Sequence, residues 1–312
     1  VKPILYNDTL FEKKVPKGLN GSMNKFIRLF FTLFLLTTSL LAAQFLEVPR
    51  KDKTPYRLSV CAMFQQEARF LKEWIEFHKM MGVEHFYLYN NNSTDHYLEV
   101  LQPYIDSGEV DLIKWNKRAK RWTAIQIDAY KNCLRRAEKQ TRWLAFIDID
   151  EFLVPYEDAT LTEFLAKQEN FSQVIVMWRY FGTGHVEKIP EGGLLTETLL
   201  QREAFVPGKK NNIKCIVKPR DVETPLVHFC KLKEKKRSIH FNQAELEFPP
   251  ILCHHYWARD IDFLNTVKRD RQMRLKGKDW TPEEYQSLID QYNEVTDEKM
   301  LQYADELRWR VF

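Results

Sequence analysis

The sequence lacks most of the short motifs that identify common enzyme classes. It contains no CxxC pair, no HExxH, no GxSxG, no P-loop and no GxGxxG. These absences argue against zinc ribbons, thioredoxin-like redox sites, zinc hydrolases, serine hydrolases, P-loop kinases and dinucleotide enzymes. The five cysteines are scattered along the chain and indicate buried thiols, although one disulfide, such as Cys230–Cys253, stays open.

A strong excess of charge of one sign is also missing. The formal net charge is +4 over 312 residues, so no dominant field points to nucleic acid. An apolar content of 44% is typical of a folded domain. The basic residues gather late in the chain, at 208–220, 231–237 and 267–278. Such clusters suit an anionic ligand or an acidic membrane surface, and a solvated face is the alternative interpretation.

The N-terminal part has the layout of an export or anchoring signal. Residues 1–22 are a polar leader. Met23 is a candidate start of the protein, and the leader would then lie upstream of the true start. Residues 23–46 begin with basic side chains and continue into an apolar run of roughly 15 residues, short against the ~20 that a spanning helix needs. We therefore expect a signal peptide or a membrane anchor, and a membrane-associated or secretory protein. If the protein is bacterial, a cytoplasmic catalytic domain is the alternative.

The rest of the chain predicts an α/β domain over residues 57–280, after a linker at 47–56 and before a C-terminal helical segment at 281–312. Continuous apolar runs of strand length alternate with segments of helical spacing, which favours a mostly parallel sheet covered by helices. The predicted strands are residues 57–64, 84–90, 110–115 and 143–150, and the predicted helices are 68–82 and 122–137. After residue 155 the order loosens into shorter strands, so a smaller mixed half is expected.

Polar side chains follow three of these strands. In open α/β sheets ligands bind beyond the carboxyl ends of the strands, so these side chains are expected to share one site. They are Gln65, Gln66 and Glu67 after the first strand, residues 90–95 after the second, and residues 148–151 after the fourth.

Asp148 and Asp150 are the leading metal candidates. In an extended chain their side chains point the same way, and Mg2+ or Mn2+ prefers carboxylate oxygens. A metal there would stabilise a departing nucleoside diphosphate. The alternative interpretation is a pair of carboxylates that accept turn or helix-cap hydrogen bonds. If residues 251–258 are extended, His254 and His255 face opposite ways, so one of them at most reaches a metal, and an imidazole suits Mn2+ better than Mg2+.

Taken together, these residues resemble the glycosyltransferase family 92 domain and its bacterial relatives. The similarity covers roughly residues 57–275. The matching segments are, in order, EARFLKEWIEFHKMMGVEHFYLYNNNSTD, then Gln126 with Ala129, Tyr130, Cys133 and Leu134, then WLAFIDIDEFL, WRYFGTGH, KCIVKP, VHF and HHYWARD. The resemblance implies a GT-A fold, in which a Rossmann-like nucleotide half joins an acceptor half. It also implies a Mn2+-type ion and a UDP-sugar donor, with galactose favoured.

The resemblance also assigns roles by position. It places Asp148 at the nucleoside or ribose, Asp150 and His255 at the metal, and Asp95 at the nucleoside. Two positions depart from the family pattern, since Gln66 and His254 stand where asparagines are usual. The full set of expected donor-binding residues is Gln66, Glu67, Asn91, Asp95, Gln126, Asp148 and Lys218, and the expected metal ligands are Asp150, Asp148 and His255.

The expected activity is that of an inverting glycosyltransferase with a glycan or glycolipid acceptor. Inversion needs a base to take the proton of the acceptor hydroxyl, and a carboxylate is expected. Glu203 is preferred among Glu187, Glu191, Glu197 and Glu203 because it follows an apolar, strand-like stretch. The alternatives are a non-catalytic carbohydrate-binding or interaction protein on the same fold, and a sugar nucleotidyltransferase. The latter would need a Gly-rich basic loop after the first strand, which MFQQEARF lacks.

Overall fold

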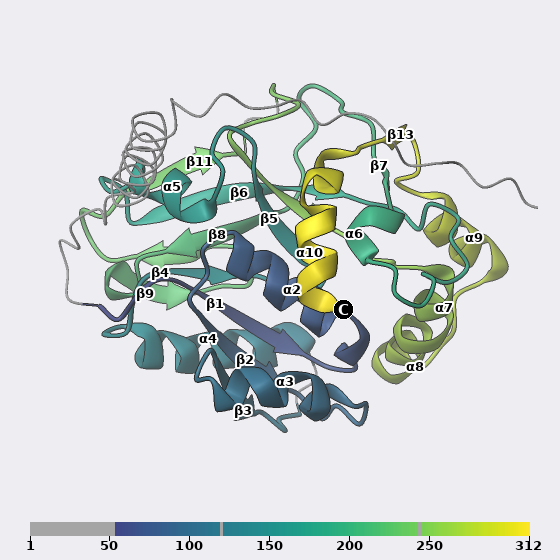
Figure 1. Cartoon of the computed structure of the whole chain (residues 1–312), viewed down its shortest axis with the longest axis horizontal. Helices are drawn as coiled ribbons and strands as arrows, with labels where there is room; N and C mark the ends of the chain where they lie inside the picture. The colour runs from purple at the N-terminus through teal and green to yellow at the C-terminus, as the bar shows by residue number, and fades with distance from the viewer. Residues whose placement is uncertain (1–53, 119–120, 243–244) are drawn as a thin grey trace, which may run out of the picture. The chain divides into compact units, whose positions relative to one another are not determined.

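A nine-stranded sheet organises the part of the chain that the computed structural model describes, which is residues 54–118, 121–242 and 245–312 (Figure 1). The strand order is β3-β2-β1-β4-β8-β6-β12-β5, and β11 adds to β6. Residues from Thr54 to Phe312 make one compact unit. The predicted polar leader and the signal or anchor at residues 23–46 lie outside the described residues.

Four parallel strands form one half of the sheet. They are β1 (Tyr56–Phe64), β2 (His85–Asn90), β3 (Val110–Lys114) and β4 (Thr141–Phe146). From Leu58 onward, every residue of β1 is buried, because helices cover both faces of the sheet. This is why β1 has a continuous apolar run and no alternation.

The other half of the sheet is mixed. Strand β8 (Ile213–Val217) runs antiparallel to β4 and to β6 (Gln173–Tyr180). Strand β12 (Ile251–His255) runs parallel to β6, and β5 (Glu151–Pro155) is antiparallel to β12. The remaining strands are β11 (Ser238–Phe241), which is parallel to β6, and the short pairs β9 (Val222–Pro225) with β10 (Cys230–Leu232) and β7 (Gln201–Arg202) with β13 (Val295–Thr296).

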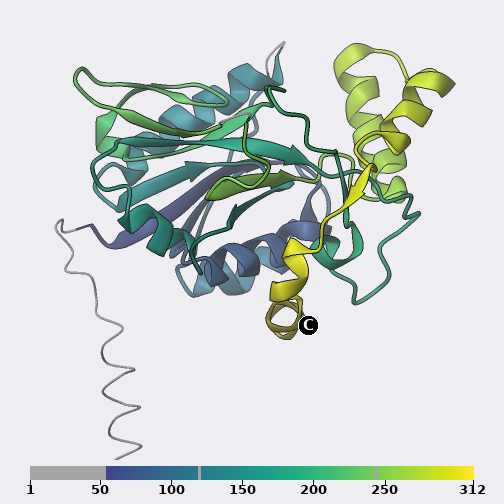
Figure 2. The same cartoon turned by 90° about the horizontal axis from the view of Figure 1, so that it is seen from above.

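Helices cover both faces of the sheet (Figure 2). Helix α2 (Ala68–Met80) buries Phe70, Leu71 and Trp74 at helical spacing and ends before Gly82, whose φ of +91° suits glycine. Helix α4 (Trp122–Ala137) covers the other face with Ile125, Ala129 and Cys133. The other helices before residue 260 in the described residues are α3 (Tyr97–Asp106), α5 (Leu161–Ala166), α6 (Leu195–Thr198) and the 3-10 turn η1 (Pro219–Asp221).

The C-terminal residues belong to the same compact unit, so residue 280 is no boundary of the fold. They form α7 (Ile261–Phe263), the π-helical turn η2 (Leu264–Lys268), α8 (Arg269–Lys276), α9 (Pro282–Asp290), the 3-10 turn η3 (Lys299–Tyr303) and α10 (Ala304–Val311). Helix α9 begins with the expected capping box of Thr281 and Glu284. Helix α10 lies beside α2 (Figure 1), where Arg310 pairs with Glu76 and Leu307 is fully buried.

The predicted α/β class, with a mostly parallel half and a mixed half as in a GT-A fold, is confirmed. Helix α3 and strand β5 were not predicted. All five cysteines are free and buried, so Cys230 and Cys253 form no disulfide. Among the helices of the described residues, none is long and apolar enough to cross a membrane.

Candidate active site

The topology brings the ends of many strands to one edge of the sheet, among them those that carry the site. Strands β1, β2, β4, β6 and β12 all point the same way, so their carboxyl ends meet there. Strands β5 and β8 run the opposite way and contribute their first residues to the same edge. The expected convergence of polar residues after the strands therefore has a geometric basis. It includes the expected residues Glu151 and His255, and Lys214 joins them from the start of β8.

Asp148 follows β4 and faces the parallel half. Its Oδ1 accepts a hydrogen bond from Gln126 Nε2 at 2.7 Å, and its Oδ2 accepts one from Lys214 Nζ at 2.7 Å. Burial alone would raise the pKa of Asp148, but the charge and hydrogen bond of Lys214 lower it below the usual value. Asp148 is thus an ionised carboxylate whose side chain stays 31% exposed.

Glu151 is the most deeply buried acid of the site. Its Oε2 lies 3.2 Å from Lys214 Nζ and accepts the Asp148 N–H at 3.0 Å, while Oε1 is buried without a hydrogen-bond partner within the described residues. Burial raises the pKa of Glu151 to about 8. Lys214 itself is 1% exposed in its side chain, and the two carboxylates raise its pKa although burial opposes this.

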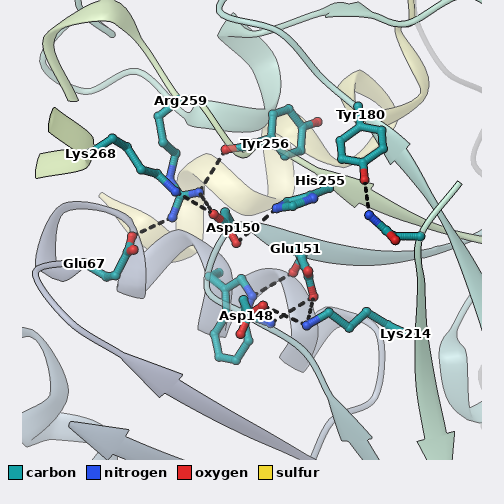
Figure 3. Close-up of polar contacts among 12 residues, drawn as sticks. Glu67, Asp148, Asp150, Glu151, Tyr180, Lys214, His255, Tyr256, Arg259 and Lys268 are labelled. Carbon is teal, nitrogen blue, oxygen red and sulfur yellow. Dashed lines mark hydrogen bonds and ion pairs between the residues drawn. The ribbon is translucent and has the colours of Figure 1, made fainter. Parts of the chain in front are cut away.

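Asp150 lies between two basic side chains and a histidine (Figure 3). Its Oδ2 is 3.1 Å from Lys268 Nζ and 3.3 Å from Arg259 Nη1, and its Oδ1 is 3.5 Å from His255 Nε2. Asp148 and Asp150 do not point the same way, because the chain turns between them: the N–H of Glu151 bonds to the Asp148 carbonyl at 3.1 Å. The expectation of an extended Asp-x-Asp pair was therefore wrong.

His255 ends β12 directly opposite Glu151 of β5 and Tyr180 of β6. Burial, followed by the charges of Lys268 and Lys214, lowers the pKa of His255 well below its usual value, so the imidazole is neutral. His254 faces the other way and bonds through Nε2 to the Tyr156 hydroxyl at 2.9 Å. Of the two adjacent histidines, His255 is the one at the acidic group.

Asp150, Glu151 and His255 form a group that can hold a metal ion. One ligand atom from each lies within 4.8 Å of the others. Two buried atoms of the group, Glu151 Oε1 and His255 Nδ1, have no hydrogen-bond partner in the described part of the chain. Two carboxylates with a neutral imidazole fit a divalent ion such as Mn2+. Asp148 is outside this group, since Gln126 and Lys214 occupy its two oxygens.

The loops after β1 and β2 are tied to each other. Gln66 Oε1 accepts the N–H of Thr94 at 2.5 Å, and Asn91 Nδ2 donates to the Trp115 carbonyl at 2.7 Å. Asp95 Oδ2 accepts the N–H of Ala68, the first residue of α2, at 2.8 Å. Its Oδ1 is buried and, within the described residues, unpaired. These loops keep Asp95 beside the carboxyl end of β1.

Glu67 connects this loop to the late basic residues. Its Oε2 lies 2.6 Å from Arg259 Nη2, and its Oε1 lies 3.6 Å from Arg271 Nη2. Arg259 therefore contacts both Glu67 and Asp150, as Figure 3 shows. Four basic side chains, Lys214, Arg259, Lys268 and Arg271, surround the acidic residues.

One predicted donor-binding residue lies away from the site, and the predicted base lies next to Tyr180. Lys218 follows the carboxyl end of β8, which is antiparallel to β4, and so lies at the opposite edge of the sheet, where its ammonium contacts Glu169 at 3.1 Å. Glu203 follows β7 and is 2% exposed. Its oxygens accept hydrogen bonds from Asn211 at 2.6 Å, Lys209 at 2.7 Å and the Tyr180 N–H at 3.2 Å. Its role as a base stays a prediction.

The sequence interpretation missed the roles of Glu151, Arg259 and Lys268. A solvated face was one interpretation of segment 267–278, yet Lys268 is only 4% exposed. One signal was available: Lys268 stands four residues after the buried Leu264, and this spacing puts both on one helix face. The contact of Lys268 with Asp150, 118 residues earlier, carries no local signal.

Comparison with known proteins identifies the family of the chain. The chain matches the profile of glycosyltransferase family 92 over residues 55–307. The chain belongs to glycosyltransferase family 92. A glycosyltransferase family 92 protein of Oryza sativa subsp. japonica is 30% identical over 219 residues, which are 67% of this chain and 35% of that protein. The chain thus spans about a third of that relative's length.

Two further similarities concern a named activity and a solved structure. The galactan beta-1,4-galactosyltransferase GALS2 of Arabidopsis thaliana is 26% identical over 170 residues, covering 51% of this chain and 32% of that protein. The crystal structure of S. aureus TarS 1-349 in complex with UDP-GlcNAc superposes with a TM-score of 0.40 at 10% identity, covering 75% of this chain and 70% of that one.

Proposed function

We propose that the protein is an inverting hexosyltransferase that moves galactose from UDP-galactose to a glycan or glycolipid acceptor with a divalent ion. The observation that carries the proposal is the group of Asp150, Glu151 and His255 at the sheet edge, surrounded by basic side chains. Family membership supports the reaction class, and the activity named for the Arabidopsis relative supports galactose as the sugar.

The residues divide the work by their charge and position. Asp150, Glu151 and His255 would hold Mn2+ or Mg2+, which supplies positive charge to the departing diphosphate when bound. Arg259 and Lys268 contact the oxygen of Asp150 that faces away from His255, and Arg271 contacts Glu67. These three cations would pair with phosphate oxygens.

The nucleoside end is assigned to the parallel half of the sheet. Asp148 keeps a partly exposed carboxylate, which Gln126 and Lys214 orient. Asp95 keeps a buried oxygen without a partner in the described chain, and a donor hydroxyl or N–H would satisfy it. We assign removal of the acceptor's proton to Glu203, whose ion-pair partner Lys209 has a side chain that is 46% exposed.

The test is binding of UDP-galactose to the full chain by calorimetry, with and without Mn2+, beside UDP-glucose and UDP-N-acetylglucosamine. We expect Mn2+-dependent binding of UDP-galactose that weakens by at least about tenfold in Asp150→Ala. The matched control is Asp106→Ala, which removes an exposed carboxylate of α3. A folded sample that binds no nucleotide sugar with metal present would contradict the proposal and favour a non-catalytic carbohydrate-binding protein.

A further inference from the structure

Two stacked tyrosines lie next to the candidate metal group. Tyr180 is the last residue of β6 and pairs in register with His255, and the centroids of the two rings are 5.5 Å apart. Tyr292 stacks on Tyr180 with centroids 4.8 Å apart and an angle of 13° between the planes. Figure 3 shows Tyr180 on the side of His255 away from Lys268 and Arg259. Both tyrosines are partly exposed, so this pair borders both the metal group and solvent.

The backbone that carries Tyr292 is strained and firmly held. Its φ is +64°, a left-handed conformation that is unfavourable for a bulky side chain. Asn293 Oδ1 accepts the Gly184 N–H at 2.8 Å, and Asn293 Nδ2 donates to the Ile289 carbonyl at 2.7 Å. At Gly182 a Cβ would lie 2.1 Å from Asn293 Oδ1, so only glycine allows this close approach. Strain that the surrounding contacts enforce is typical of ligand-binding positions.

A buried hydrogen-bond donor next to the pair has no partner. Trp178 is 7% exposed, and its indole Nε1 is unpaired within the described residues. Its ring centroid lies 4.2 Å from that of His255 and 5.5 Å from that of Tyr180. A buried N–H without an acceptor costs free energy, which a ligand oxygen would recover. In addition, the exposed Asn212 donates to the Tyr180 hydroxyl at 2.9 Å and adds an amide beside it.

The charge around the pair differs from that around Asp150. A donor diphosphate needs cations, and Arg259, Lys268 and Arg271 lie with Asp150 and Glu67. The acid beside Tyr180 is Glu203, which accepts the Tyr180 N–H. Lys209 Nζ lies 2.7 Å from its carboxylate and neutralises its charge. An aromatic surface with amide and indole donors and little net charge matches a neutral sugar ring, which has an apolar C–H face and hydroxyl groups.

We propose that Tyr180, Tyr292 and Trp178 form the subsite for the acceptor, a neutral pyranose at the end of a glycan, with Tyr292 as the residue that stacks on the sugar. This inference rests on the proposed glycosyltransferase function. It places the acceptor beside His255 on the side away from the diphosphate-binding cations, which is where a sugar must lie to receive a group from the donor. It also places the acceptor near Glu203, since the Tyr180 N–H bonds to that carboxylate.

The test separates acceptor binding from donor binding in the full chain. The substitution Tyr292→Asn removes the ring but tolerates a positive φ, whereas Tyr292→Phe keeps the ring. The probes are beta-1,4-galactotetraose, cellotetraose and mannotetraose for the acceptor, and UDP-galactose with Mn2+ for the donor. We expect Tyr292→Asn to weaken binding of the preferred oligosaccharide on the order of tenfold and to leave UDP-galactose binding unchanged. Tyr292→Phe should bind both as the wild type does. The control is Trp309→Ala on α10, an aromatic side chain that is 82% exposed.

Three results would overturn the subsite. In the first, Tyr292→Asn binds the oligosaccharide as tightly as the wild type. In the second, it loses oligosaccharide and UDP-galactose affinity equally, which indicates a general structural role. In the third, the wild type binds UDP-galactose but none of the oligosaccharides, which refutes the acceptor subsite and leaves the proposed donor site standing. Failure of the wild type to bind UDP-galactose as well would instead refute the proposed function itself.

Discussion

Lys214 offers the sharpest test of the electrostatics of the site. It is the second residue of β8, at the end of the strand that borders the site, and its side chain is only 1% exposed. Its ammonium contacts Asp148 at 2.7 Å and Glu151 at 3.2 Å. In Lys214→Met the two carboxylates lose their shared cation while the volume of the side chain changes little. Because removing one partner of a buried ion pair leaves a charge uncompensated, we expect the free energy of unfolding to fall by about 3–5 kcal/mol. The melting temperature should fall by on the order of 10 °C.

The pH dependence of this loss follows from the two carboxyl groups. The pKa of Asp148 is lowered in the folded state, so its carboxylate stabilises the fold at pH values above its pKa in the unfolded chain. Lys214→Met removes this contribution to stability. The pKa of Glu151 is about 8 in the folded protein, against 4.5 in the unfolded chain. Its contribution to stability is therefore fully present below about pH 4.5 and is lost as the pH rises through 8. Without Lys214 the pKa of Glu151 rises further and this loss becomes larger. The deficit of the variant should therefore be larger at about pH 9 than at about pH 5.

The assay is urea unfolding of the wild type, Lys214→Met and Lys214→Met/Glu151→Gln at both pH values. In the double variant a neutral amide stands in place of the Glu151 carboxyl group, which loses its proton at high pH. The double variant should therefore recover part of the lost free energy of unfolding, most of it at the higher pH. A deficit below about 1 kcal/mol, the range of a solvent-exposed ion pair, would refute the reasoning. A deficit that does not change with pH would refute the role of Glu151.

Two further substitutions test the loops that shape the site. Asp95→Ala removes the acceptor for the Ala68 N–H at the start of α2 and should cost about 1 kcal/mol in urea unfolding, with Asp95→Asn costing less; equal stability of all three proteins would contradict a capping role. Gly182→Ala puts a Cβ 2.1 Å from Asn293 Oδ1 and should cost about 1–3 kcal/mol in thermal unfolding while weakening oligosaccharide binding. Unchanged stability would show that the loop moves aside freely.

Much of the fold could be predicted because local patterns determine it. The apolar run of β1 reflects burial on both faces, and the periodicity of residues 122–137 gives the bounds of α4. The helix α3 was missed because its segment carries Pro103 inside and buries only Leu101 and Tyr104, which weakens the periodic pattern. Strand β5 was missed because it begins directly after Asp150, a short turn away from the end of β4 at Phe146, so its apolar residues resemble a continuation of β4.

The site could be predicted in part. Strand ends that meet at one edge follow from a parallel sheet, and this gave Asp148, Asp150 and the residues after β1 and β2. Partners from distant segments could not be derived in this way. Lys268 contacts Asp150 from the π-helical turn after α7, and Arg259 contacts it from a left-handed backbone with φ of +60°. Neither conformation is encoded in an amphipathic pattern.

The distribution of charge explains how a metal and a donor fit the same site. Four acids of the site, Glu67, Asp148, Asp150 and Glu151, each contact a basic side chain. A divalent ion alone would therefore add positive charge to a group of acids whose negative charge is already largely compensated. A nucleoside diphosphate brings negative charge that Arg259 and Lys268 can pair with, and this releases Asp150 from part of its contact with them. The two oxygens of Asp150 already differ in this way, since Oδ2 faces the cations and Oδ1 faces His255. Under the proposed function the site would be complementary to the ion and the diphosphate together, and each should favour the binding of the other.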